Sequence, residues 1–266
     1  MVAISTSETL SPELGIVLKD FDVHAELSSV ECDELRDTIA RHRLILIRGT
    51  DVSAADQRRL LQVFGNVVDE KENSLFYSLV DNRISPNGEE GDECAYHCDY
   101  SFKPKPVAVV SLFGMDIPAE CAKTRFVDGI RACKQMPDAL RKRLEGKSVL
   151  HASDVTTATA ESTGRLGVED LESRNFLGTL HPAILPHPRT GEPILFINQY
   201  LCIRIDGVSH AESDALLSDV FAYIYAESNV YEHSWQPRDL LIFDNIALQH
   251  MRTKGPLRIL RRMIAY

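Results

Sequence analysis

The sequence lacks the features of a membrane or secreted protein. Its 266 residues contain no apolar run that approaches the roughly 20 residues needed to span a bilayer. Its first residues lack the basic start and apolar core of a secretory signal. The six cysteines follow no disulfide-framework spacing, which suits a reducing compartment. We therefore expect a cytoplasmic protein with no membrane partner.

The sequence is also short of positive charge and of several common catalytic motifs. With 29 Lys and Arg against 39 Asp and Glu, the formal net charge is -10, which argues against nucleic acid as a partner. A glycine-rich phosphate loop, a Gly-x-Ser-x-Gly elbow and a His-Glu-x-x-His helix are all missing. Nucleotide-binding and hydrolase functions therefore lack a motif to carry them.

Short apolar segments alternate with helical patterns and polar loops. Strands are expected at residues 44–47, 107–113, 194–197 and 240–243. Helices are expected over residues 29–40, 53–64, 128–145 and 211–226. The first strand is apolar throughout and is therefore expected to be buried on both faces. In the first helix Val30, Leu35 and Ile39 form the expected buried stripe, and Pro137 restarts the third helix.

The organisation of the chain favours one domain. Because no internal repeat or low-complexity linker divides it, we expect a single domain over residues 1–266. Two polar stretches, residues 71–93 and 154–178, are predicted to be lid loops. Short strands with a few helices outside them favour a mainly β fold with peripheral helices. We expect its core to be a double-stranded β-helix, the cupin-like jelly roll.

The pattern with the clearest chemical meaning is His97 and Asp99, followed much later by His250. Two histidines and one carboxylate form the facial triad of non-haem iron(II) oxygenases, which leaves other coordination positions open. On a strand, residues i and i+2 share a face, so His97 and Asp99 are expected to reach one metal while Cys98 points away. A structural zinc site with Cys94, His97 and Cys98 is the competing interpretation, although no second cysteine pair with finger-like spacing is present.

Three other histidines bear on this interpretation. His181 and His187 flank a loop that precedes a strand, where a hydrogen bond to the backbone is the expected role. For His151 the sequence leaves two interpretations open: a structural role, or a position near the site.

Closely spaced arginines follow His250. Arg258 and Arg262 are four residues apart, so on a strand they share a face. The planar, permanently charged guanidinium suits a carboxylate, which predicts an anion anchor beside the metal ligands. One of the three arginines Arg258, Arg261 and Arg262 is expected to lie on a solvated edge strand.

Several segments together resemble a known family, the taurine/2,4-dichlorophenoxyacetate (TauD/TfdA) dioxygenases, which depend on Fe(II) and 2-oxoglutarate. Residues 96–102, Tyr-His-Cys-Asp-Tyr-Ser-Phe, are similar to the family's Trp-His-x-Asp-x-Ser/Thr-Phe segment. The similarity continues through residues 126–128, 136–137, 181–198 and 235–262. It covers most of the chain from about Leu44 onward.

The resemblance implies a metal centre and its cosubstrates. It implies Fe(II) ligation by His97, Asp99 and His250, with 2-oxoglutarate and O2 as cosubstrates. The retained carboxylate at Asp99 argues against halogenation, because halogenases of this broad class vacate that position to admit halide.

The resemblance also implies a cosubstrate site. Thr124 is placed where the family has a threonine that helps to hold 2-oxoglutarate, and Arg258 where an arginine pairs with its distal carboxylate. Arg262 resembles a second arginine that binds an anionic substrate group in some members. Because the segment before Arg258 is a few residues shorter than in familiar members, Arg261 remains an alternative to Arg258.

The expected function is oxidation of a small molecule coupled to decarboxylation of 2-oxoglutarate. Hydroxylation, desaturation, epoxidation and cyclisation are all open outcomes at such a site. We expect an anionic or amino-acid-like substrate, and Glu93 is a candidate partner for an amine. A homo-oligomer is compatible with the sequence. Two alternatives stay open: a non-catalytic jelly-roll protein that binds a small dicarboxylate, and a Lewis-acid metal hydrolase or isomerase.

Overall fold

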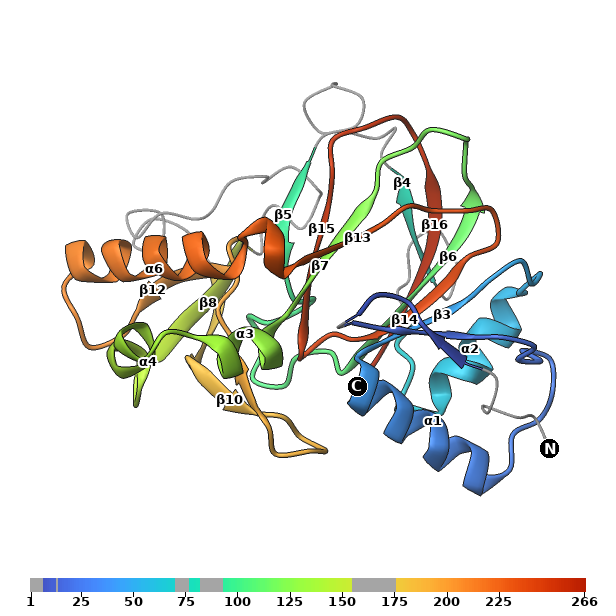
Figure 1. The fold of residues 1–266 in the computed structure, drawn as a ribbon, viewed down its shortest axis with the longest axis horizontal. Helices are drawn as coiled ribbons and strands as arrows, with labels where there is room; N and C mark the ends of the chain where they lie inside the picture. Colours follow the sequence, from blue (N-terminus) through green and yellow to red (C-terminus); the bar gives the residue numbers. More distant parts are fainter. Residues whose placement is uncertain (1–6, 13, 70–76, 82–92, 155–175) are drawn as a thin grey trace.

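The computed structural model describes residues 7–12, 14–69, 77–81, 93–154 and 176–266. Most residues of the two predicted lid loops, 71–93 and 154–178, lie outside the described residues. Where they are described, residues 78–81 form strand β4 and residues 176–178 begin strand β9 (Phe176–Pro182), so the loop prediction is wrong there. Within the described part the chain is mainly β, with helices on the outside (Figure 1). The helices are α1 (Ser29–His42), α2 (Ala54–Gln62), α3 (Gly129–Gln135), α4 (Asp138–Leu144), α6 (His210–Ile224) and the 3-10 turn η1 (Glu227–Asn229).

Two facing, largely antiparallel sheets form the centre of the molecule. The larger has the order β1 (Ser7–Thr9), β2 (Ile16–Leu18), β3 (Leu44–Ile47), β14 (Leu240–Asp244), β6 (Val109–Asp116), β16 (Ile259–Ala265), β4 (Ser78–Asp81). The smaller has the order β13 (Val230–His233), β7 (Thr124–Asp128), β15 (Leu248–Arg252), β5 (Cys94–His97). Two such sheets with an apolar layer between them form the expected jelly roll.

Strand β3 shows why a continuous apolar run is needed in the larger sheet. Leu44 and Leu46 pack into the layer between the sheets, together with Phe126 of β7. Ile45 and Ile47 point the other way, into the apolar cluster that α1 and α2 cover. All four side chains are almost completely buried, because successive residues of a strand face opposite sides and both sides are covered here. The predicted burial on both faces is confirmed.

Helix α1 begins at Ser29, as expected, and a capping box closes its start. The Ser28 hydroxyl accepts a hydrogen bond from the Glu31 N–H, and the Glu31 carboxylate accepts one from the Ser28 N–H, which is a capping box. Leu35 and Ile39 are buried as predicted, but Val30 is 65% exposed, so that part of the prediction is wrong. At about 100° per residue, Val30 lies about 140° around the helix from Leu35, outside the buried stripe.

The remaining elements pack beside the smaller sheet (Figure 1). They are α3, α4, α6, the three-stranded sheet β12 (Cys202–Ile205), β8 (Ser148–Asp154), β9 (Phe176–Pro182) and the pair β10 (Ile184–Pro186), β11 (Pro193–Leu195). The predicted helix break is confirmed, because Met136 takes the extended conformation favoured before proline and Pro137 is the N-cap of α4. The strand predicted over residues 194–197 is confined to Pro193–Leu195. None of the helices in the described segments is both long and apolar enough to cross a membrane.

Candidate active site

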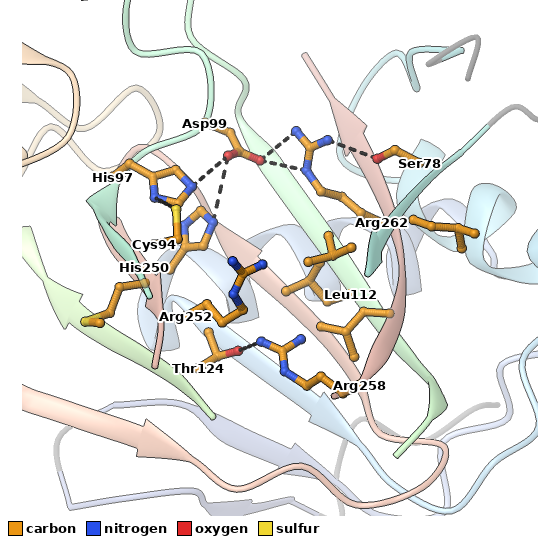
Figure 2. Close-up of a pocket in the computed structure, with 14 residues that line it drawn as sticks. Ser78, Cys94, His97, Asp99, Leu112, Thr124, His250, Arg252, Arg258 and Arg262 are labelled. Atoms are coloured by element: carbon orange, nitrogen blue, oxygen red, sulfur yellow. Dashed lines mark hydrogen bonds and ion pairs between the residues drawn. The ribbon is translucent and has the colours of Figure 1, made fainter. Parts of the chain in front are cut away.

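A cavity of about 280 Å³ opens between the two facing sheets (Figure 2). Side chains of β5, β7 and β15 line it from the smaller sheet, and side chains of β4, β6 and β16 from the larger one. All the residues predicted to bind the metal or 2-oxoglutarate line this cavity: His97, Asp99, Thr124, His250, Arg258 and Arg262. Residues as far apart in the sequence as Ser78 and Arg262 therefore line one cavity.

Strand pairing brings His97 and His250 together. His97 ends β5 and lies directly opposite His250 of β15 in the antiparallel ladder. Side chains of directly opposite residues project to the same side, and the two imidazole ring centroids are 4.2 Å apart. The His250 ring also packs against Phe243, at 4.9 Å, and against its β7 neighbour Phe126, at 6.3 Å. Apolar rings thus hold the orientation of this imidazole.

Asp99 reaches the histidines from a turn, so the prediction that it lies on the same strand as His97 is wrong. Strand β5 ends at His97, and the Ser101 N–H donates to the Cys98 carbonyl at 3.2 Å to close the turn. A distant side chain holds this turn: the Asp99 N–H donates to Asn245 Oδ1 at 2.8 Å, and the Asp99 carbonyl accepts from Asn245 Nδ2 at 3.0 Å. Cys98 points away as predicted, with its thiol 3.6 Å from a main-chain carbonyl of β15.

One ligand atom from each of His97, Asp99 and His250 lies within 4.8 Å of the other two. Asp99 Oδ1 is 3.4 Å from His97 Nε2 and 3.8 Å from His250 Nε2. His97 Nδ1 lies 2.8 Å from the Ala95 carbonyl, which can only accept, so Nδ1 carries a proton and Nε2 faces the carboxylate. Imidazole and carboxylate lone pairs at this spacing repel one another unless a proton or a metal cation lies between them. The donor set therefore fits a divalent metal.

Arg262 holds the other oxygen of the same carboxylate. Its Nε and Nη2 donate to Asp99 Oδ2 at 2.9 and 2.8 Å, and its Nη1 donates to Ser78 Oγ at 3.1 Å. Burial raises the pKa of the Asp99 carboxyl, but the Arg262 guanidinium and the adjacent histidines outweigh burial and hold that pKa well below its usual range. Asp99 is therefore ionised, with Oδ1 turned towards the histidines (Figure 2).

The two histidines take up protons differently. Burial, reinforced by the charge of His97, lowers the pKa of His250 to about 3. Burial also opposes the charged form of His97, but Cys94 and Asp99 outweigh it and raise the pKa of His97 well above its usual value. In the metal-free protein His97 is therefore the histidine that takes up an additional proton, at Nε2, while His250 stays neutral. A metal bound at this site would displace that proton, because a metal binds the neutral imidazole.

The zinc interpretation with Cys94, His97 and Cys98 fails on geometry. Cys94 lines the cavity, but its Sγ lies 3.9 Å from His97 Nδ1, whereas Asp99 faces Nε2. A register shift in the β5–β15 pairing adds a residue on β5, which is why Cys94 and His97 face one cavity although they are three residues apart. Cys98 faces the opposite side.

Thr124 and Arg258 form a second polar group in the cavity. The Arg258 side chain donates from Nη2 to Thr124 Oγ1 at 3.1 Å and from Nε to the Ala122 carbonyl at 2.6 Å. Trp235 donates from Nε1 to the same Thr124 oxygen at 3.0 Å, and its ring lies 5.3 Å from the Arg258 guanidinium. Burial, reinforced by the charge of Arg252, lowers the pKa of Arg258 to about 9. A cation desolvated to this extent is stabilised when an anion joins it.

Arg261 faces the opposite side of β16. Its Nε donates to Gln57 Oε1 of α2 at 2.6 Å, and its guanidinium lies 4.7 Å from the Phe113 ring. Of the two candidates for the cosubstrate, Arg258 therefore lines the cavity and Arg261 does not. The expectation that one of the three arginines lies on a solvated edge strand is wrong, because β16 is flanked by β6 and β4 and both Arg258 and Arg261 are buried.

The structure adds residues that the sequence analysis did not assign. Arg252 lines the cavity two residues after His250 on β15. That i, i+2 spacing could have predicted that Arg252 shares a face with His250. Ser78 and Asn245 had no such signal, because their partners Arg262 and Asp99 are remote in sequence. Glu93, the candidate partner for an amine, is exposed and is not among the residues that line the cavity.

The other histidines have structural contacts. His181 Nε2 lies 3.0 Å from a main-chain carbonyl, and His187 Nδ1 accepts from two main-chain N–H groups, so the predicted backbone roles are confirmed. His187 Nε2 also lies 2.6 Å from Asp244 Oδ2. His151 is fully buried outside the cavity, with Nε2 3.0 Å from the Cys202 thiol.

A jelly roll that presents two histidines and one carboxylate at a cavity is typical of the mononuclear non-haem oxygenases. The family model described as "Taurine catabolism dioxygenase TauD, TfdA family" matches residues 6–264. The chain therefore belongs to this family, as the sequence motifs indicated. It is accordingly an enzyme of the 2-oxoglutarate-dependent dioxygenase class, a class that requires a metal.

Relatives and solved structures agree with this assignment. Pentalenolactone F synthase of Streptomyces avermitilis is 25% identical over 94% of this chain and 90% of its own length. A putative alpha-ketoglutarate-dependent sulfonate dioxygenase of Schizosaccharomyces pombe is 24% identical over 98% of this chain and 68% of its own. The crystal structure of a taurine dioxygenase from Burkholderia xenovorans superposes with a TM-score of 0.80 at 20% identity, over 97% of this chain and 89% of that one. At that identity the last comparison shows the fold, and it confirms the jelly roll.

Proposed function

We propose that this enzyme uses Fe(II), bound by His97, Asp99 and His250, to couple decarboxylation of 2-oxoglutarate to oxidation of a small organic substrate. The observation that carries the proposal is the convergence of His97 Nε2 and His250 Nε2 on Asp99 Oδ1, in the same cavity as the Arg258–Thr124 pair. Fe(II) supplies O2 activation when bound. The protein orients the three ligands and shields the cavity between two apolar sheets.

The distal carboxylate of 2-oxoglutarate is proposed to bind Arg258 and Thr124. The Thr124 hydroxyl oxygen accepts hydrogen bonds from both Trp235 and Arg258, which uses its two lone pairs. Its own hydrogen is therefore directed to a further acceptor, and a carboxylate is the acceptor that a neighbouring guanidinium favours. This arrangement makes Trp235 a positioning residue for the threonine.

We propose two roles for Arg262, which are to hold the Asp99 carboxylate and to attract an anionic group of the substrate. Its Nε and Nη2 hold Asp99 Oδ2, which leaves Oδ1 for the metal. We infer a small anionic substrate, because Arg262 lines the cavity beside Asp99 and resembles the family arginine that binds an anionic substrate group. The names of two relatives, a sulfonate dioxygenase and an alkylsulfatase of Acinetobacter baylyi, are consistent with this charge preference. Hydroxylation is the proposed outcome, with desaturation, epoxidation and cyclisation as related C–H oxidations.

The proposal is tested by anaerobic reconstitution with Fe(II) and 2-oxoglutarate. We expect a weak visible charge-transfer band in the wild type and its loss in His250→Ala. The matched control is His24→Ala, an exposed histidine paired with Asp56 far from the cavity lining, which should keep the band. Iron binding without the band would overturn the cosubstrate assignment and favour the Lewis-acid alternative. A band with no succinate release in air, across a panel of carboxylate and sulfonate substrates, would favour the binding-protein alternative.

A further inference from the structure

Asn198 contacts the turn that carries Asp99. Its Nδ2 donates to Ser101 Oγ at 3.1 Å. Ser101 lies two residues after Asp99 and closes the turn through its N–H, which donates to the Cys98 carbonyl at 3.2 Å. The Asn198 amide is itself fixed, because its Oδ1 accepts from the Leu201 N–H at 2.8 Å. Asn198 and Ser101 are almost completely buried, so water does not readily replace the bond between them.

The segment that contains Asn198, residues 197–201, is also joined to the strand of His97. The Tyr200 N–H donates to the carbonyl of Tyr96, the residue before His97, at 3.0 Å. The Tyr200 ring centroid lies 5.8 Å from that of His97. One short segment therefore contacts the chain just before the first metal ligand and just after the second.

The third ligand, His250, is tied to the same segment through its neighbour Gln249. The Gln249 side chain faces away from the cavity, because successive residues of a strand point to opposite sides. Its Nε2 donates to the Ile197 carbonyl at 2.7 Å, and its Oε1 accepts from the Tyr225 hydroxyl at 2.5 Å. The Tyr225 oxygen accepts in turn from the Gln199 N–H at 3.0 Å. Segment 197–201 thus contacts both strands that carry histidine ligands.

We propose that segment 197–201 sets the positions of the three metal ligands relative to one another. Asn198 is the positioning residue for Asp99, and Gln249 carries the contact to the strand of His250. This inference rests on the proposed function, in which these side chains bind Fe(II). A metal binds tightly only when its ligand atoms are oriented by the contacts behind them. A turn or a strand that is released from the segment should therefore bind metal more weakly.

The test measures the affinity of the folded protein for Co(II), used as the probe in place of Fe(II). Asn198→Ala removes the donor, Ser101→Ala removes the acceptor, and the double variant removes both. Ser101→Thr is the conservative variant, because it keeps the hydroxyl and because the family motif has Ser or Thr at this position. Ser53→Ala is the matched control, since it removes the N-cap of α2 away from the cavity lining.

We expect Co(II) affinity to fall about 10- to 100-fold in Asn198→Ala and in Ser101→Ala, the range for loss of a contact behind a ligand. The double variant should lose no more than about twice what the weaker-binding single variant loses, because both changes remove one bond. Ser101→Thr should stay within about 3-fold of wild type. Ser53→Ala should melt at a lower temperature but bind Co(II) as wild type does.

Gln249→Leu tests the contact to the strand of His250. Leucine fills a similar volume but bonds neither the Ile197 carbonyl nor the Tyr225 hydroxyl. Co(II) affinity should fall by at least about 10-fold. The visible absorption bands of bound Co(II) should also shift, because they report the arrangement of its ligands. Circular dichroism establishes that each variant is folded.

Unchanged Co(II) affinity in folded Asn198→Ala or in folded Gln249→Leu would overturn the proposal. Losses that multiply in the double variant would overturn it as well, because Asn198 would then act independently of Ser101. So would an equal loss in Ser53→Ala, because metal affinity would then simply follow stability. If Asn198→Ala does not fold, Ser101→Ala decides the question, since it removes a single oxygen atom.

A wild-type protein that binds neither Co(II) nor Fe(II) would instead defeat the proposed function. The wild-type titration therefore separates the two failures before any variant is measured.

Discussion

Two kinds of buried histidine–aspartate contact occur in this protein. At the cavity, Asp99 Oδ1 lies 3.4 and 3.8 Å from the Nε2 atoms of two histidines. Away from the cavity, His187 Nε2 lies 2.6 Å from Asp244 Oδ2, and His233 Nε2 lies 3.1 Å from Asp239 Oδ2. The residue types are the same in both, but the spacing and the number of partners differ.

The His187–Asp244 pair is complete as a hydrogen-bonded pair. Because His187 Nδ1 accepts from two main-chain N–H groups, its proton is on Nε2 and is donated to Asp244. The other oxygen of Asp244 accepts from the N–H groups of Ile246 and Ala247. A hydrogen bond draws one donor to one acceptor, whereas a metal keeps several ligand atoms apart, each about 2 Å from itself. The longer distances and the carboxylate oxygen shared by two histidines therefore distinguish the candidate metal site at Asp99 from a structural hydrogen-bonded pair.

The largest effect is expected for Asp99→Ala. Turnover should become undetectable because the carboxylate ligand is lost. The free energy of unfolding should also fall by about 1–3 kcal/mol, because the half-buried Arg262 loses its charge-assisted hydrogen bonds to Asp99. Succinate release and urea unfolding measure the two effects. Adding Arg262→Met should restore most of the stability and none of the turnover, whereas wild-type turnover in Asp99→Ala would contradict the ligand role.

His250→Ala and His187→Ala compare the two kinds of contact directly. His250→Ala should weaken Co(II) or Fe(II) binding by more than the roughly 100-fold that outer-shell changes produce. His187→Ala should keep stoichiometric metal binding but lower the free energy of unfolding by about 1–3 kcal/mol, because Asp244 loses a hydrogen bond. Metal titration and urea unfolding of both variants check this, and loss of metal by folded His187→Ala would refute the distinction.

Asn245→Ala tests how the turn that carries Asp99 is held. Without the amide, the Asp99 main chain loses a donor and an acceptor, so the carboxylate should shift and metal affinity should fall about 10- to 100-fold. Asn229→Ala is the matched control, because its side chain bonds the Tyr223 carbonyl outside the cavity. Unchanged Co(II) affinity in folded Asn245→Ala would show that the turn holds its shape without this side chain.

His151 extends the comparison to a buried histidine with no carboxylate partner among the residues described around it. Burial, reinforced by His181, lowers the pKa of His151 to about 3. Between these two pKa values the unfolded chain binds a proton at His151 and the folded chain does not. The free energy of unfolding is therefore greatest above about pH 6.5 and falls as the pH drops towards 3. At pH 5 the loss is about 2 kcal/mol. Urea unfolding of His151→Gln at pH 7 and pH 5 should show a smaller pH dependence than wild type.

Several features of the fold and site were readable from local patterns. The apolar run at residues 44–47, the helix start at Ser29 and the break at Pro137 were visible because each depends on near neighbours in the chain. The even spacing of Arg258 and Arg262 correctly placed both on one side of the strand region, facing the cavity. Such rules follow from the two-residue period of a strand and the 3.6-residue period of a helix.

The differences at the site share a cause, which is contact with segments remote in the sequence. Asp99 lies in a turn that Asn245 holds, 146 residues further along the chain. Cys94 faces the cavity because a register shift against β15 breaks the simple alternation of β5. Arg261 is buried because α2 supplies Gln57 on the far side of the sheet. In each case the residues near the affected position give no sign of the distant segment that contacts it.

The sequence by itself determined the class of fold, the family and the identity of the His97, Asp99 and His250 group, because these depend on residue types and local periods. Only the tertiary structure decided that Arg258 rather than Arg261 lines the cavity, that Arg262 grips Asp99, and that Asn198 bonds Ser101. The physical reason is that side-chain direction follows from strand register and turns. Both are set by hydrogen bonds between segments far apart in the chain.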